Sequence, residues 1–164
     1  MSLDAILLQK LAEWKPPAGG ERGALAATDP DAGWTATVTA DRNDGLSTLV
    51  WELTVRRPRD QAPSGGDALR AWADRSASRV TGLMEPLKVV EVDVLKNAAM
   101  LRSDEPASRA DKVFYYEVFL KGCHEAAVRR YQVAREPGQP REQVAFPLTH
   151  EALAKLAKDL TAEK

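Results

Sequence analysis

Acidic side chains recur in segments whose residue pattern predicts β-strands. If these strands share one sheet, four carboxylates fall on the same face: Glu52, Glu91, Asp93 and Glu117. Two carboxylates at a suitable separation can act as general acid and general base. Arg56 and either Arg129 or Arg130 could lie on that face too, and cross-strand pairing would neutralise the acids. A solvated ion-pair face is therefore our first interpretation, and acid–base catalysis is the second.

The chain has two histidines and one cysteine, and none of them occurs at a spacing typical of a metal site. His124 adjoins Cys123, and we expect a partly buried thiol rather than an activated nucleophile. His150 falls where the last helix is expected to begin, and we expect it to face solvent. The sequence contains no phosphate-binding loop and no nucleophile-elbow motif. It therefore predicts no catalytic residue, no metal and no cofactor.

The charge of the chain is nearly balanced, because 23 lysines and arginines stand against 24 aspartates and glutamates, for a net charge of −1. Such a balance disfavours nucleic acid and anionic membranes as partners. The N-terminal residues lack the basic region of a signal peptide, and the apolar stretch at residues 5–8 is too short to span a bilayer. A lone cysteine fits a reducing compartment. We expect a cytoplasmic protein that binds neither nucleic acid nor membrane.

The first half of the chain predicts a helix followed by a β-hairpin. Apolar residues at helical spacing follow Ser2 and end at two prolines: Leu3, Leu7, Leu11 and Trp14. Residues 21–32 are weakly patterned and predict a surface linker, with a short strand near 24–28 as the alternative. Residues 34–41 and 47–57 alternate around an Asn-Asp-Gly turn, which is typical of a hairpin. In the second of these strands we expect one face to carry Leu49, Trp51, Leu53 and Val55.

A second helix is predicted where Leu69, Trp72, Ser76 and Val80 recur at spacings of three and four. Residues 87–95 alternate and predict a strand. Residues 98–102 form either a partner strand or a continuation past a bulge. Polar residues 103–111 predict a loop.

The most strongly patterned strand is residues 112–121, with Tyr116, Val118 and Leu120 on one face. Both of its faces are largely apolar, as is typical of a central strand. Residues 125–135 fit a strand better than a helix, because Gly122 allows a hairpin turn, but a helix remains the alternative. Residues 136–143 predict a loop. A last helix follows Thr149 and carries Leu153, Leu156, Ala157 and Leu160 on its apolar face.

Taken together, the elements predict a single α+β domain spanning residues 1–164. Residues 1–32 supply an N-terminal helix and linker, and residues 33–164 supply the sheet and the other helices. The expected order is α-β-β-α-β-(β)-β-β-α, with an antiparallel sheet of about five to six strands and helices packed on it.

The layout resembles the PsbP-like fold: two strands, a helix, a run of antiparallel strands and a closing helix. The residues that carry the resemblance are Gly33-Trp34 opening the first strand, the helix at residues 69–80, the hairpin at 112–135 and the helix at 153–160. The order is also similar to that of type III secretion chaperones, although those usually have an acidic surface. Both resemblances imply a non-catalytic binding, assembly or chaperone-like protein.

We therefore expect an interaction module that binds a protein partner or a second copy of itself. The candidate binding residues are Tyr115, Phe119, Glu117, Trp51, Glu91 and Arg129. Tyr115 and Phe119 lie on the less covered face of the strand at 112–121, where an apolar patch would mark a binding surface. The alternative is a small-molecule binding protein or enzyme whose pocket, between sheet and helices, is lined by Glu117, Glu91 and Trp51.

Overall fold

Segments of alternating polar and apolar residues pair into one antiparallel sheet. The computed structural model describes residues 1–17 and 19–164, and within them it has ten strands and three α-helices. The strands are β1 Gly23–Thr28, β2 Thr35–Asn43, β3 Ser47–Arg56, β4 Leu87–Asp93, β5 Ala98–Ser103, β6 Ala107–Arg109, β7 Lys112–Lys121, β8 Glu125–Ala134, β9 Glu142–Val144 and β10 Phe146–Thr149. The helices are α1 Leu3–Glu13, α2 Gly66–Arg79 and α3 His150–Leu160, with a 3-10 turn η1 at Arg59–Gln61.

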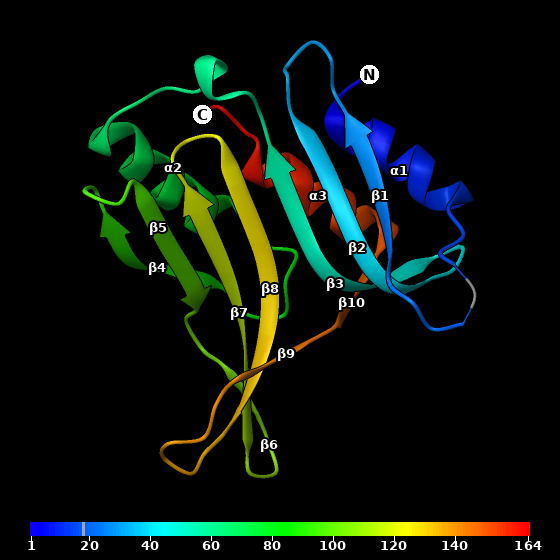
Figure 1. Ribbon diagram of the computed structural model, residues 1–164, viewed down its shortest axis with the longest axis vertical. Coiled ribbons are helices and arrows are strands. Elements are labelled where there is room, and N and C mark those ends of the chain that lie inside the picture. The colour runs from blue at the N-terminus through cyan, green and yellow to red at the C-terminus, as the bar shows by residue number, and fades with distance from the viewer. Residues whose placement is uncertain (18) are drawn as a thin grey trace.

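The sheet follows the order β1-β2-β3-β8-β7-β5-β4 (Figure 1). Three short strands pair beside this path: β6 with β7, β9 with β8, and β10 with β3. The second half of β3 pairs with β8, whereas its first half pairs with β10. The far end of β8 pairs with β9. Strands β9 and β10 therefore lie where β3 and β8 diverge, and they satisfy backbone groups that the divergence would otherwise leave unpaired.

The α+β class and the antiparallel sheet with helices are confirmed, but the predicted number of five to six strands is wrong. Strand β6 arises inside a segment predicted as a loop, β9 begins in the loop predicted at 136–143 and extends one residue past it, and β10 contains Pro147. Each is only three or four residues long, so its pairing with a neighbouring strand, rather than its own pattern, makes it a strand. Within residues 21–32, the alternative of a short strand near 24–28 is confirmed, because residues 23–28 form β1 and pair with β2.

Strands β7 and β8 form the longest ladder of the sheet, and the helical alternative for residues 125–135 is wrong. Ten consecutive pairs run without a shift from Lys112 opposite Ala134 to Lys121 opposite Glu125. Gly122, with a φ of 52°, makes the tight turn between them.

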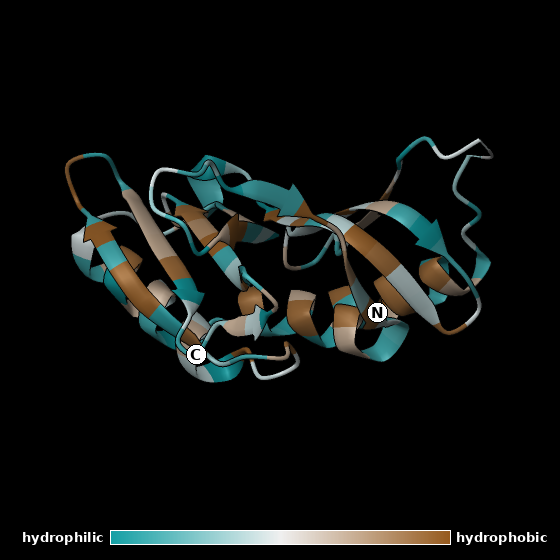
Figure 2. Ribbon diagram, turned by 90° about the horizontal axis from the view of Figure 1, so that it is seen from below, coloured by the Kyte–Doolittle hydropathy of each residue, from teal (hydrophilic) through white to brown (hydrophobic). Residues whose placement is uncertain are grey.

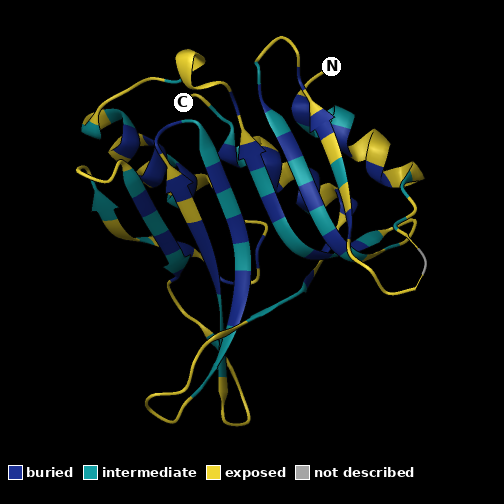
Figure 3. Cartoon of the chain, in the orientation of Figure 1, coloured by how far each residue is buried: buried dark blue, intermediate teal, exposed yellow. Residues whose placement is uncertain are grey.

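One face of the sheet is covered by the helices. Figure 2, which views the molecule from below, shows the helices along one side of the strands. Helix α3 contacts α1, α2 and β3, while α1 packs on β1 and α2 packs on β4 and β5. The strands alternate between buried and more exposed residues (Figure 3). The core between the layers includes Val38, Leu53, Tyr116, Val118, Leu120 and Val128 from the sheet and Leu7, Leu69, Trp72, Leu153 and Leu156 from the helices.

The alternation in β3 changes phase at Trp51. The β2–β3 register shifts at this position, a β-bulge, so that Thr39 pairs with Glu52 but Ala40 pairs with Val50. Val50 and Leu53 are consequently both buried, and Trp51 is only half-buried. The predicted grouping of Leu49 and Trp51 with Leu53 on one face is therefore wrong.

Asn43 joins three segments that are distant in sequence. Its amide nitrogen donates to the carbonyls of Leu11 (2.9 Å) and Trp14 (2.8 Å) at the end of α1. Its amide oxygen accepts from the Thr48 hydroxyl (2.6 Å) and lies 2.9 Å from Nε2 of His150 at the start of α3. His150 is buried rather than facing solvent as predicted, because this contact holds its ring against the hairpin.

Replacing Asn43 by alanine should destabilise the fold by about 2–4 kcal/mol, because two carbonyls, a hydroxyl and an imidazole lose a partially buried partner. Urea unfolding measures the change. The control Gln132→Ala removes one exposed hydrogen bond to Glu142 and should cost less than about 0.5 kcal/mol. Equal effects of the two variants would show that Asn43 has no special structural role.

Candidate functional site: the open face of the sheet

The second face of the sheet has no helix packed on it within the described residues. We call this surface the open face. Its centre is formed by outward residues of β5, β7 and β8, namely Met100, Arg102, Tyr115, Glu117, Phe119, Ala127, Arg129 and Tyr131, with Arg141 from the loop before β9; Glu52 of β3 and Glu91 of β4 flank this centre. The register places Tyr115 opposite Tyr131, Glu117 opposite Arg129, and Phe119 opposite Ala127.

The structure brings together four of the six predicted binding residues. Tyr115, Glu117 and Phe119 follow one another on β7, and Arg129 lies beside Glu117 on β8. Glu91 lies two strands away from Phe119, because it pairs with Met100, and Met100 pairs with Phe119. These residues point away from the helices.

Trp51 lies apart from this group. Its ring is covered by Arg22, whose guanidinium carbon is 3.6 Å from the ring centre, and Arg22 in turn pairs with Asp41 (2.7 Å). Glu117 and Glu91 lie on the open face, and Trp51 is outside the core at the bulge. The three residues therefore do not line a pocket between sheet and helices, as the alternative hypothesis required.

Glu117 is the centre of the polar contacts on the open face. Its carboxylate, only 7% exposed, accepts from Nε of Arg102 (3.1 Å) and from Nη1 of Arg141 (2.7 Å). Arg141 also donates to the hydroxyl of Tyr115 (3.3 Å) and lies 3.8 Å from the ring centre of Tyr131. The hydrogen bond to Glu117 raises the pKa of the Arg141 guanidinium, which therefore stays charged at any physiological pH.

The sequence does not predict a role for Arg141. This residue lies in a segment rich in proline and glycine, where apolar residues do not recur at strand or helix spacing. Only its contact with β7, made through the fold, gives it a role. The rings of Tyr115 and Tyr131 complete the cluster by stacking at 5.8 Å between centres.

Glu52 and Glu117 are each paired with arginine, which disfavours their joint use in acid–base catalysis. Glu52 binds Arg129 at 2.6 Å, and β8 separates Glu52 on β3 from Glu117 on β7. A general acid and base must face a common substrate, whereas each of these two carboxylates faces a guanidinium. The structure thus agrees with the ion-pair interpretation for Glu52 and Glu117.

Around Glu117, the open face presents mainly guanidinium groups to solvent. The side chains of Arg102, Arg129 and Arg141 are 40–41% exposed, while the carboxylates of Glu117 and Glu52 lie lower, at 7% and 23%. Among these five side chains the positive charges exceed the negative ones by one, whereas Glu91 and Asp93 line a hollow together with Phe119. Beside them Phe119 is 40% exposed. We call the surface formed by Arg102, Arg129, Arg141 and Phe119 the strip. It combines positive charge with an apolar side chain.

A hollow of about 490 Å³ lies at the margin of the strip. It is lined by Lys88, Val90, Arg102, Pro106, Tyr115 and Val133. Its floor is apolar and aromatic, and two cationic side chains border it. Such a hollow can hold an apolar side chain next to a negative charge.

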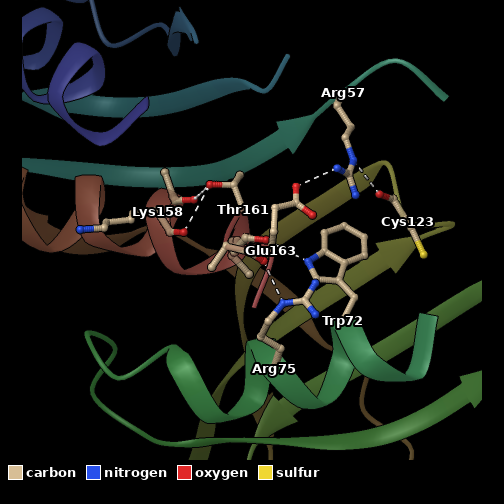
Figure 4. Close-up of polar contacts among 10 residues, drawn as sticks. Arg57, Trp72, Arg75, Cys123, Lys158, Thr161 and Glu163 are labelled. Carbon is tan, nitrogen blue, oxygen red and sulfur yellow. Dashed lines mark hydrogen bonds and ion pairs between the residues drawn. The ribbon is translucent and has the colours of Figure 1, made fainter. Parts of the chain in front are cut away.

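The cysteine has the environment of a structural residue. Cys123 is buried, and burial raises the pKa of its thiol. Its carbonyl accepts from Nε of Arg57 (3.1 Å), and Arg57 also pairs with Glu163 (2.9 Å; Figure 4). Nearby, Trp72 and Arg75 donate to carbonyls of the C-terminal segment at 2.8 Å. These contacts fasten that segment to the core and leave no activated nucleophile here.

Two further features, metal-binding clusters and membrane-spanning helices, are absent from the described part of the chain. No group of three or more histidine, cysteine, aspartate or glutamate side chains is arranged to hold a metal ion there. None of the described helices combines the length and the apolar composition needed to cross a bilayer.

Comparison of the chain with family models, with curated proteins and with solved structures finds no match. The resemblances to the PsbP-like fold and to type III secretion chaperones therefore stay predictions.

The environment of Cys123 predicts slow alkylation of the folded protein at pH 8. A matched exposed thiol is Leu95→Cys in a Cys123→Ser background, because Leu95 is 99% exposed. We expect the thiol at position 95 to react with iodoacetamide about 100-fold faster than Cys123, since only the thiolate is a nucleophile. Equal rates in the folded state, followed by mass spectrometry, would contradict this account and reopen a catalytic role.

Proposed function

We propose that this protein is a non-catalytic interaction module that binds a protein segment on the open face. The observation that carries the proposal is the exposed Phe119 near three arginines. These arginines are more exposed to solvent than the carboxylates with which they pair. Surfaces that bind proteins are commonly enriched in aromatic and arginine side chains.

The chemistry of the open face favours a partner segment with acidic and apolar side chains. Arg102, Arg129 and Arg141 are already oriented by Glu117 and Glu52, so binding would cost little side-chain entropy. Carboxylates of the partner would receive charge-assisted hydrogen bonds from the exposed guanidinium groups. An apolar side chain of the partner would fill the hollow between Val90 and Tyr115.

A reducing, cytoplasmic location and a chaperone-like or assembly role are parts of the same proposal. The lone thiol supports the location. The pairing of Glu52 and Glu117 with arginines supports a binding role over a catalytic one. Nucleic acid is a poorer partner than an acidic protein segment, because the arginines of the strip are paired with carboxylates and the net charge of the chain is −1.

The proposal is tested by comparing Phe119→Ser with Leu95→Ser as immobilised baits in extracts of the native host. Leu95 is the matched control, because it is apolar and more exposed than Phe119 but lies in the turn between β4 and β5. We expect Phe119→Ser to lower recovery of a specific partner by at least about tenfold, as loss of an interface hot spot does. Leu95→Ser should recover it like the wild type.

A second arm tests the predicted chemistry of the partner. Recovery should fall as salt rises from about 50 to 500 mM, because screening weakens contacts between arginine and carboxylate. The proposal is wrong if Phe119→Ser keeps the partners of the wild type, or if both variants lose them equally. Circular dichroism and urea unfolding verify that both baits are folded.

A further inference from the structure

A second hollow, separate from the strip, lies at one end of the sheet where three connections meet. These are the β3–α2 connection, the β4–β5 turn and the β7–β8 turn, all at the upper end in Figure 1. The hollow measures about 320 Å³ and lies between Arg59, Ser64, Lys96, Asn97, Lys121 and His124. Two backbone hydrogen bonds hold the turns together, from Gly122 to Asn97 (2.7 Å) and from Arg57 to His124 (2.9 Å).

The charged side chains that line this hollow are all positive. Arg59, Lys96 and Lys121 line it, and no aspartate or glutamate does. In the part of the chain that the structure describes, none of these three cations forms an ion pair. The arginines of the open face, by contrast, all have carboxylate partners. Unpaired charges of one sign around a concave surface raise the local concentration of counter-ions.

Two acidic residues close in sequence to the lining residues have other hydrogen-bond or ion-pair partners. Asp93 accepts the backbone N–H of Lys96 (3.1 Å), and Glu125 pairs with Arg56 (3.1 Å). Neither carboxylate lines the hollow, so the positive charge there is not cancelled from within.

Neutral donors add to the cations. The Asn97 side chain is exposed at the turn, and Ser64 lies two residues before the first residue of α2. The hollow thus offers both charge and directed hydrogen bonds to an oxyanion.

We propose that this hollow binds the phosphate group of a phosphomonoester. Three cations fit a dianion better than a single carboxylate, and tetrahedral oxygens can accept from several donors at once. The volume exceeds that of a phosphate alone, so part of the molecule that carries the phosphate can enter as well. The site lies outside the strip and would act independently of partner binding there.

His124 provides an internal reporter for the site. Burial lowers the pKa of its imidazole below the ordinary value, and the positive charges of Arg59, Lys121 and Arg56 act in the same direction. Glu125 acts in the opposite direction. A bound dianion would stabilise the imidazolium, so phosphate should raise the pKa of His124.

The test follows the His124 ring signals of the full chain by NMR while sodium phosphate replaces sodium chloride at constant ionic strength. We expect a saturable shift below about 20 mM phosphate and a rise in the pKa of His124. Lys121→Gln should weaken apparent phosphate affinity about fivefold, through loss of one charge–charge contact. The matched control is Lys112→Gln, at the opposite end of β7, which should leave the affinity within about twofold.

The proposal is overturned by a lack of saturation, by an equal shift in chloride alone, or by equal effects of the Lys121 and Lys112 substitutions. Lys96 is a less decisive position, because it also borders a neighbouring hollow lined by Glu91 and Asp93. Once phosphate binds, glycerol phosphate and a phosphoserine peptide distinguish the two possible sources of the group. The tighter of these probes identifies a small metabolite or a modified protein.

Discussion

The register of β7 against β8 is the constraint on which the rest of the structure depends. This ladder joins the part of the sheet that ends in β1 to the part that ends in β4, since β8 pairs with β3 and β7 pairs with β5. Side chains alternate along a strand, so a slip of one residue would exchange the two faces. In the observed register Tyr116, Val118 and Leu120 enter the core, and Tyr115, Glu117 and Phe119 remain outside.

The same register distributes charge to both sides of the sheet. Arg129 and Arg130 are adjacent in sequence but lie on opposite faces. Arg129 pairs with Glu52 on the open face, whereas Arg130 is buried with Glu85 (3.1 Å) on the core side and lies 4.1 Å from the ring centre of Tyr116. Removing one partner of the buried pair would leave an uncompensated charge in the core. The pairing therefore favours this register over its alternatives.

The spacing of apolar residues in the sequence predicts most of the strands and helices. It predicts only part of the candidate binding site. The alternation of residues 112–121 and the helical spacing of Leu69, Trp72 and Ser76 predict the elements that carry the core. The bulge at Trp51 is not predictable, because one extra residue reverses the phase without changing composition. Arg141 and the contact between Asn43 and His150 depend on segments that meet only in the folded chain. Pattern indicates which face a residue occupies, but not which distant side chain it contacts.

Helices close one face of the sheet, and we propose that the other face binds a protein. The most direct measurement places a photo-crosslinking phenylalanine analogue at position 119 on the open face, in cells of the native host. The comparison position is Met84, which is 64% exposed in the connection between α2 and β4. The account predicts a discrete crosslinked partner from position 119 and none from position 84. Crosslinking only from position 84, or the same products from both, would contradict it.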